Sequence, residues 1–148
     1  LAALDGARVQ PVHGDFHVGQ VLRSAAGLAV IDFDGNPVAP ADALGAPDLP
    51  ERDLAGLLCS IDHVGRIVAR RLGPSAEAPV ARWIAAETAA AAGAYADAAV
   101  AAGRTRPDAD RVRALRVEQE MRELLYAAEH LPRWRYAPMG AIRAMVPR

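Results

Sequence analysis

Several side chains that bind metal ions or move protons are concentrated in one short stretch of the sequence. The segment VHGDFHVGQVLRSAAGLAVIDFDGNP, residues 12–37, contains His13, Asp15, His17, Gln20, Asp32 and Asp34. Mg²⁺ in proteins takes oxygen ligands, and phosphoryl transfer also needs a carboxylate that orients and deprotonates the attacking hydroxyl. The segment therefore predicts a site that holds a metal ion and a polyphosphate.

The order of these side chains fits the same chemistry. Asp15 lies in a loop, Gln20 follows five residues later, and Asp32 ends an apolar run. Protein kinases use the Asp and Asn of a catalytic loop, followed by the Asp of D-F-G, in this order. The arrangement therefore favours a phosphotransferase.

The segments HGDFHVGQVL and VIDF resemble the catalytic motifs of the aminoglycoside phosphotransferase-like kinases, H-G-D-x-H-x-x-N and I-D-[FW]. Gln20 stands where most members have Asn, and its amide still offers an oxygen to a metal. Within this family, QPVHGDFHVGQ, DFDGNP and RELLYAAEHLPRWRY are most similar to the actinobacterial glucosamine kinases, and next to the maltokinases. The resemblance implies that residues 1–148 are the C-terminal lobe of a protein-kinase-like fold.

The resemblance also implies an activity and assigns residues to it. The activity is ATP-dependent phosphorylation of a sugar hydroxyl, glucosamine to glucosamine 6-phosphate, with Mg²⁺. Asp15 would be the catalytic base, and Gln20 and Asp32 would hold the metal. The sugar would be bound by Gln10, Asp15, Glu123 and Trp134.

Four further residues are expected to support the site, namely His13, His17, Asp34 and Asp53. His13 would orient the loop, Asp34 would contact a metal ligand, and Asp53 would hold the loop backbone. The alternatives are a plain turn residue for Asp34, a neighbouring-carbonyl contact for His17, and a favourable helix-dipole position for Asp53.

A polar stripe gives the sugar site partial support of its own. The stripe lies on one face of an expected helix, at positions i, i+4, i+7 and i+11, and consists of Gln119, Glu123, Tyr126 and His130. Hydrogen-bonding groups suit a sugar, a carboxylate suits the ammonium of an amino sugar, and Trp134 is able to stack on the ring. The alternatives are a solvated helix face for Glu123 and a tail contact with the core for Trp134.

The elements that position these residues form a mostly α fold with one small β-hairpin. Strands are expected within 18–24 and 28–33, and helices over about 48–72, 78–102 and 107–130. The first of these helices would begin with a capping box in DLPE, and Trp83 in the second would be buried. Residues 1–7 read as the end of a helix, and residues 131–148 as an irregular tail.

Composition narrows the class of protein. The net charge of −1 gives no basic excess for nucleic acid, and we find neither a signal peptide nor a long apolar run. The single cysteine, Cys59, lies among apolar residues and predicts a buried, inert thiol in a reducing compartment. We therefore expect a cytoplasmic protein whose partners are a sugar and ATP, with no nucleic acid and no membrane.

One part of a kinase is missing from the sequence. All 17 basic residues are arginine, so the lysine that kinases use on the donor phosphates is absent. We expect this chain to be a C-terminal catalytic and substrate-binding lobe without its N-terminal ATP-binding lobe. The open alternatives are a maltokinase or an aminoglycoside-type kinase and, from another class, a truncated non-catalytic sugar-binding module.

Overall fold

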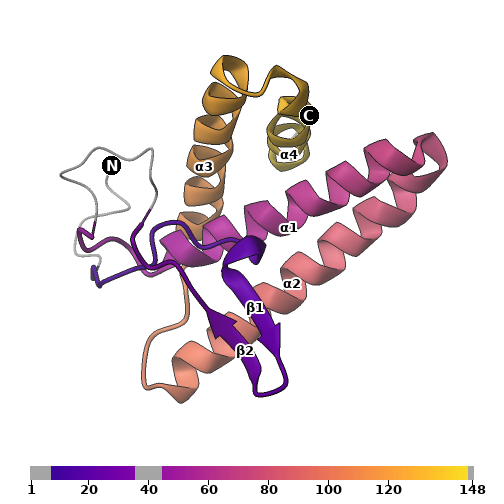
Figure 1. The fold of residues 1–148 in the computed structure, drawn as a ribbon. Helices are drawn as coiled ribbons and strands as arrows, with labels where there is room; N and C mark the ends of the chain where they lie inside the picture. The colour runs from indigo at the N-terminus through magenta and orange to yellow at the C-terminus, as the bar shows by residue number, and fades with distance from the viewer. Residues whose placement is uncertain (1–7, 36–44, 147–148) are drawn as a thin grey trace.

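The computed structural model describes residues 8–35 and 45–146. Its elements are η2 (Val18–Gln20), β1 (Val21–Ser24), β2 (Gly27–Val30), α1 (Glu51–Leu72), η3 (Pro74–Ala76), α2 (Glu77–Ala101), α3 (Ala109–Glu129), η4 (Pro132–Trp134) and α4 (Tyr136–Met145), where η marks a 3-10 helix. The predicted fold class, mostly helical with one small hairpin, is confirmed (Figure 1). The helix end predicted for residues 1–7 lies outside the described residues.

Helix α1 is the centre of the structure. It packs against α2, α3 and α4, and α2 runs back beside it after the turn at Gly73 (Figure 1). Leu54, Leu58 and Cys59 recur on one face of α1 and are almost completely buried. The helix predicted over about 48–72 is therefore confirmed, with buried residues at helical spacing in its first half.

Helix α2 contributes little to the core. None of its described residues is buried, and Trp83 is 42% exposed, so the prediction of a buried tryptophan is wrong. The reason is that α2 packs on α1 and η3 and leaves its other faces uncovered. Alanines supply helix propensity and allow the close approach to α1. No helix in the described part of the chain is both long and apolar enough to span a bilayer.

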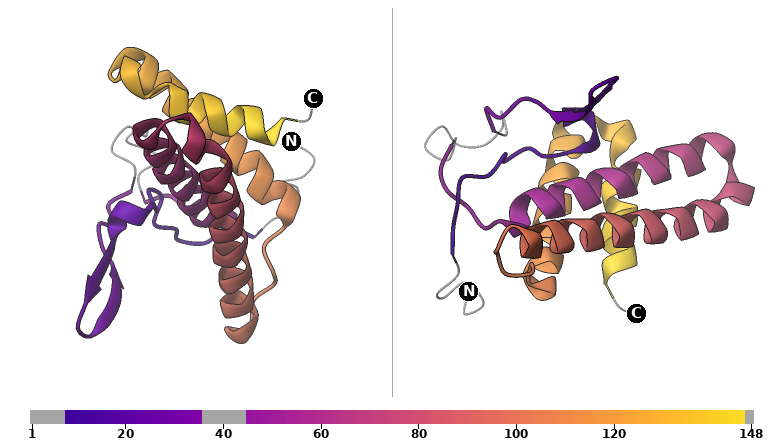
Figure 2. Two further views of the ribbon diagram at one scale, coloured as in Figure 1. Left: turned by 90° about the vertical axis from the view of Figure 1, so that its right-hand side faces the viewer. Right: turned by 90° about the horizontal axis from the view of Figure 1, so that it is seen from below.

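The hairpin pairs Val21 with Val30 and Ser24 with Gly27, and it stands clear of the helices (Figure 2). The first strand begins three residues later than predicted, and the second strand ends three residues earlier. Residues 18–20 form a 3-10 turn closed by the bond from the Gln20 N–H to the His17 carbonyl, 2.9 Å long. The Ile31 N–H donates to the Gln20 carbonyl at 3.0 Å, just beyond the paired strands.

The predicted capping box at the start of α1 is wrong. The N-cap is Pro50, and no side chain caps the first turn. The Asp48 carboxylate instead accepts a bond from Arg52 Nε at 2.7 Å. The buried Glu51 carboxylate accepts from the Asp108 N–H at 3.1 Å, which ties the start of α1 to the start of α3.

The prediction of an irregular tail is also wrong, since most of it forms η4 and α4. Pro138 lies in the first turn of α4, where its missing N–H breaks no helical bond. Ala137, Pro138 and Ala141 are buried, so packing against the rest of the structure stabilises this short helix.

Two helical glycines differ sharply in the space around them. A Cβ added to Gly65, on α1, would collide with the side chain of Ile84 on α2. A Cβ added to Gly93, on α2, would meet no atom of the described residues within 4 Å. Gly65 therefore sets how closely α1 and α2 pack, whereas Gly93 only weakens its helix.

We predict opposite effects for the two alanine substitutions. Gly93→Ala should raise the free energy of unfolding by about 0.5–1 kcal/mol, because it removes the cost of a mid-helix glycine. Gly65→Ala should lower it by about 1–2 kcal/mol, because overpacking outweighs the same gain. Urea unfolding of both variants measures the difference, and an equal stabilisation would contradict the close packing at Gly65.

Candidate active site

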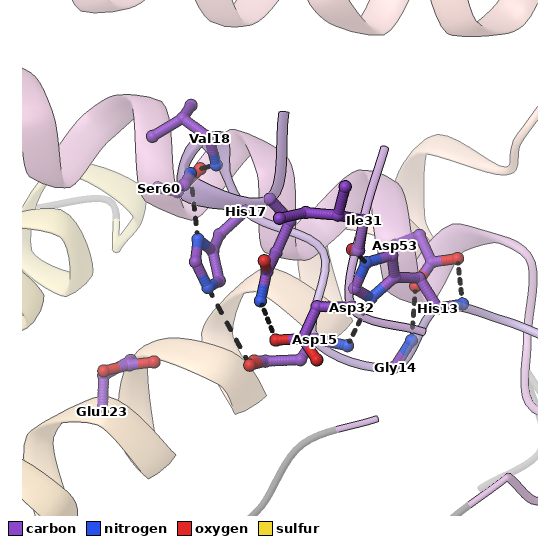
Figure 3. A network of polar contacts seen from close by, with 12 residues as sticks. His13, Gly14, Asp15, His17, Val18, Ile31, Asp32, Asp53, Ser60 and Glu123 are labelled. Atoms are coloured by element: carbon purple, nitrogen blue, oxygen red, sulfur yellow. Dashed lines mark hydrogen bonds and ion pairs between the residues drawn. The ribbon is translucent and has the colours of Figure 1, made fainter. Parts of the chain in front are cut away.

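One face of α1 holds the loop that carries Asp15. The Asp53 carboxylate accepts the N–H of His13 at 2.8 Å and the N–H of Gly14 at 3.0 Å (Figure 3). One helical turn further on, a Cβ at Gly56 would come within 2.7 Å of the Phe16 carbonyl oxygen. Two turns from Asp53, Ser60 Oγ accepts the N–H of Val18 at 3.1 Å. Asp53, Gly56 and Ser60 thus form a template for residues 13–18.

His13 connects this loop to the end of the hairpin. Its ring is buried, and Nε2 lies 2.8 Å from the Ile31 carbonyl oxygen. Nδ1 accepts the N–H of Asp15 at 3.3 Å, so Nε2 carries the proton that is donated to Ile31. The ring therefore fixes Asp15 relative to Ile31 and to the next residue, Asp32.

The Asp15 carboxylate lies among groups of both charges. Burial raises its pKa above the usual value, and the Asp32 carboxylate raises it further, although His17, His13 and Arg122 oppose the shift. His17 Nε2 is 3.9 Å from Asp15 Oδ2, and its Nδ1 accepts the N–H of Gly19 at 3.0 Å. An aspartate with a raised pKa is a stronger base than an exposed one.

Gln20 and Asp32 meet at the base of the hairpin. Gln20 Nε2 donates to Asp32 Oδ2 at 2.7 Å, and Asp32 has a φ of 65°, which is rare for a residue with a side chain. Gln20 is buried, whereas Asp32 is exposed. A carboxylate and an amide in contact, with one of them open to solvent, fit a Mg²⁺ ion that takes its remaining oxygens from phosphates and water.

A cavity of about 260 Å³ opens beside Asp15. It lies between the Asp15 loop, α1, α3 and η4, and it is lined among others by Asp15, His17, His63, Gln119, Glu123 and Trp134. Glu123 is held by Gln119, whose Nε2 donates to Glu123 Oε1 at 3.0 Å. Figure 3 shows Glu123 on the opposite side of Asp15 from Asp53. The structure thus brings Asp15, Glu123 and Trp134 together at one cavity.

One predicted site residue, Gln10, lies elsewhere, and the role of a second, Asp34, stays a prediction. Gln10 forms backbone bonds with Asp48, and its side-chain oxygen accepts from Arg104, so it does not line the cavity beside Asp15. The backbone pairing with Asp48 directs it to a separate cavity near Tyr95. Asp34 is exposed in the turn that follows Asp32, and none of the described hydrogen bonds involves it.

Sequence reasoning missed the contribution of α1 to this cavity. Gly56, Ser60 and His63 all line it, at i, i+4 and i+7 of the helix. Small and polar residues at that spacing, within an otherwise apolar helix, were the available signal. Cys59 also lines the cavity, but it is 2% exposed, which confirms the predicted buried thiol. Burial raises the pKa of this thiol, in line with the expected lack of reactivity.

No family model matches the chain, but individual known proteins are similar to it. The glucosamine kinases of Streptacidiphilus jiangxiensis and Mycolicibacterium smegmatis are each 44% identical over 99% of the chain. A solved glucosamine kinase, crystal form B, superposes with a TM-score of 0.89 at 42% identity over 99% of the chain and 37% of that structure. The chain is similar to glucosamine kinases.

A second solved structure is a glucosamine kinase in complex with glucosamine, ADP and inorganic phosphate. It superposes with a TM-score of 0.83 at 44% identity and covers 92% of the chain and 34% of that structure. The chain spans only 34% and 37% of the two curated relatives. The similarity therefore covers the described fold, and about a third of each relative.

We predict that Asp53 stabilises the loop through its two bonds. Asp53→Ala should lower the free energy of unfolding by about 2–4 kcal/mol, because two N–H groups lose a charged acceptor. Asp97→Ala is the control, since Asp97 is exposed in its ion pair with Arg106 and should cost less than about 1 kcal/mol.

Urea unfolding measures both variants, and amide hydrogen exchange locates the effect. Loss of protection in Asp53→Ala should be largest at the N–H groups of His13 and Gly14. Unchanged protection at these two amides would contradict the template role of α1.

Proposed function

We propose that this chain is the C-terminal lobe of an ATP-dependent glucosamine kinase with the protein-kinase-like fold of the aminoglycoside phosphotransferase family. The observation that carries the proposal is the meeting of Asp15 with Glu123 and Trp134 at one cavity, beside Gln20 and Asp32. The similarity to glucosamine kinases, one of them solved with glucosamine and ADP, supports it.

The cavity suits an amino monosaccharide as the acceptor. Its volume of about 260 Å³ is below the roughly 300–1,000 Å³ typical of pockets for larger ligands, which favours one sugar ring over two. Trp134 offers an aromatic face to that ring, and Glu123 offers a carboxylate to an ammonium group. In glucosamine the 2-amino group and the 6-hydroxyl lie on opposite sides of the ring. Binding of the amine at Glu123 therefore leaves the 6-hydroxyl for Asp15.

The reaction follows from the placement of Asp15. Its carboxylate accepts the proton of the attacking hydroxyl while the sugar oxygen bonds to the γ-phosphorus of ATP, and the bond to the β,γ-bridging oxygen breaks to release ADP. The raised pKa of Asp15, caused first by burial, makes it a better proton acceptor. The His13 ring fixes the residue by accepting its backbone N–H, and His17 lies 3.9 Å from the carboxylate.

Asp32 and the amide oxygen of Gln20 would hold Mg²⁺. When bound, this ion neutralises charge on the phosphates of the donor. The positive φ of Asp32 points to the same role, because strained backbone of this kind is concentrated at functional sites. The donor phosphates also need a lysine, which this chain lacks, so the proposal places that residue in an N-terminal lobe of the whole kinase.

A coupled assay of ADP release by the whole kinase tests the function. Glucosamine, glucose, maltose and an aminoglycoside should be compared as acceptors at the same enzyme concentration. We expect the highest kcat/KM with glucosamine. A preference for maltose or for the aminoglycoside would assign that compound as the acceptor in place of glucosamine. If none of the four gives ADP release, the result would favour the non-catalytic sugar-binding module.

We predict that Asp32→Asn in the whole kinase lowers kcat by at least about 100-fold, because the variant loses a charged ligand for the metal. Asparagine tolerates positive φ, so the melting temperature should stay close to that of the wild type. Asp97→Asn on α2 is the control and should leave kcat unchanged. Undiminished turnover in Asp32→Asn would remove the metal assignment.

We predict that Glu123→Gln discriminates between sugars. A charge-assisted contact of about 1.5–3 kcal/mol corresponds to a loss of about 10- to 100-fold in kcat/KM for glucosamine. Glucose has no ammonium group, so its kcat/KM should change much less. Glu129→Gln, at the exposed end of the same helix, is the control.

Asp15→Asn should behave differently in the same assay. It should lower kcat for glucosamine and glucose alike, because the base acts on the hydroxyl of every acceptor. Equal losses on both sugars in Glu123→Gln would reject the recognition of the amine by Glu123.

A further inference from the structure

A buried ion pair links α1 to α3 under the cavity. His63 Nε2 lies 2.7 Å from Glu120 Oε2, and the Glu120 side chain is fully buried. The second oxygen, Glu120 Oε1, is buried and has no hydrogen-bond partner among the described residues. A carboxylate in such a place is tolerated when a donor faces it, and His63 is that donor.

The other side of the His63 ring belongs to the cavity. His63 lines the 260 Å³ cavity together with Asp15, Glu123 and Trp134, and its side chain is 16% exposed. Since Nε2 is bound to Glu120, Nδ1 is the remaining polar atom of the ring. No hydrogen bond in the described part of the chain involves Nδ1. The ring therefore presents an unused hydrogen-bonding group beside the expected position of the sugar.

The charges around His63 favour its contact with Glu120 and so a single orientation of the ring. Burial lowers its pKa, but the hydrogen bond and charge of Glu120, followed by the charges of Glu123 and Asp62, raise the pKa above the usual value overall. Besides Glu123 and the buried Cys59, the other titratable side chains that line the same cavity are Asp15, His17 and Arg52. Glu120 thus holds Nε2 toward α3 and leaves Nδ1 as the nitrogen without a described partner, on a ring that lines the cavity.

We propose that His63 is a further sugar-binding residue, which contacts the acceptor through Nδ1, and that Glu120 is the residue that positions it. The inference rests on the proposed kinase function, since the ligand is the acceptor sugar. It assigns to α1 a direct role in sugar binding, in addition to its role in holding the Asp15 loop. The competing explanation is that His63 only satisfies the buried Glu120.

Two substitutions of His63 separate these explanations. The amide nitrogen of Gln reaches the position of Nε2, so His63→Gln keeps the contact with Glu120 and removes Nδ1. The amide group of Asn takes the position of Nδ1 with either its oxygen or its nitrogen, so His63→Asn keeps a hydrogen-bonding group at the cavity and loses the contact with Glu120. His130→Gln is the matched control, because His130 is exposed and does not line the cavity.

The test is the steady-state kinetics of the whole kinase with glucosamine, together with melting temperatures. We expect His63→Gln to raise KM about 3- to 10-fold with kcat within about twofold of the wild type, as for the loss of one hydrogen bond. We expect His63→Asn to melt at a lower temperature but to keep KM within about twofold. Glu120→Gln should raise KM while kcat is retained, because the ring loses its fixed orientation, and His130→Gln should change nothing.

The outcomes distinguish failure of the inference from failure of the proposed function. A wild-type enzyme that does not phosphorylate glucosamine overturns both. An active wild type with an unchanged KM in His63→Gln, or with a higher KM in His63→Asn than in His63→Gln, overturns the sugar contact alone. If His63→Gln does not fold, the other two variants decide. A KM within about twofold of the wild type in His63→Asn and a raised KM in Glu120→Gln support the sugar contact, and the reverse overturns it.

Discussion

The pairing of one face of α1 with the backbone of residues 13–18 is the interaction on which the site depends. A loop between irregular segments has N–H groups that no ladder satisfies, and buried N–H groups without partners are costly. Asp53 and Ser60 supply acceptors for three of them, and Gly56 lets the loop backbone lie directly on the helix. Asp15 has a fixed position because the backbone on either side of it is bound to a rigid element.

Helix α1 also fixes the position of two other parts of the structure. Through His13 and Ile31 it reaches Asp32 at the end of the hairpin, and through His63 and Glu120 it reaches α3. Buried charges are costly unless they are paired, so these contacts do not simply add stability. They have few alternative geometries, and that property suits a site in which several side chains must converge on one small ligand.

The sequence predicted well what is local along the chain. Asp15, Gln20 and Asp32 lie within 18 residues of one another, and their spacing sufficed to predict a common site. Glu123 was predicted from the family resemblance, with partial support from a polar stripe on a helix. Its distance from Asp15 depends on how α3 crosses α1, which no local pattern encodes. Gln10 shows the limit of such reasoning, because pairing with Asp48 takes it to another cavity although it is five residues from Asp15.

Errors in the predicted elements have a similar origin. Asp48 and Glu51 have the spacing of a capping box, yet each carboxylate has another partner. Asp48 binds the Arg52 side chain in the first turn of α1, and Glu51 binds the start of α3. The other two errors come from packing. The segment of α4 is helical because its buried alanines pack against the rest of the structure, although it contains a proline. Trp83 is exposed because only one face of α2 is covered.

How firmly the candidate metal ligands are held in place depends on what covers the hairpin. Gln20 precedes β1 and Asp32 follows β2, and a two-stranded ribbon is only marginally stable on its own. Leu22, Leu28 and Phe33 are 51%, 74% and 66% exposed, and in the described part of the chain no third strand pairs with either edge. Any molecule that binds only the paired strands lowers their tendency to fray, and thermodynamic linkage requires that it also increase the fraction of molecules with Gln20 and Asp32 in contact. Metal affinity and occupancy of the ribbon surface should therefore rise and fall together.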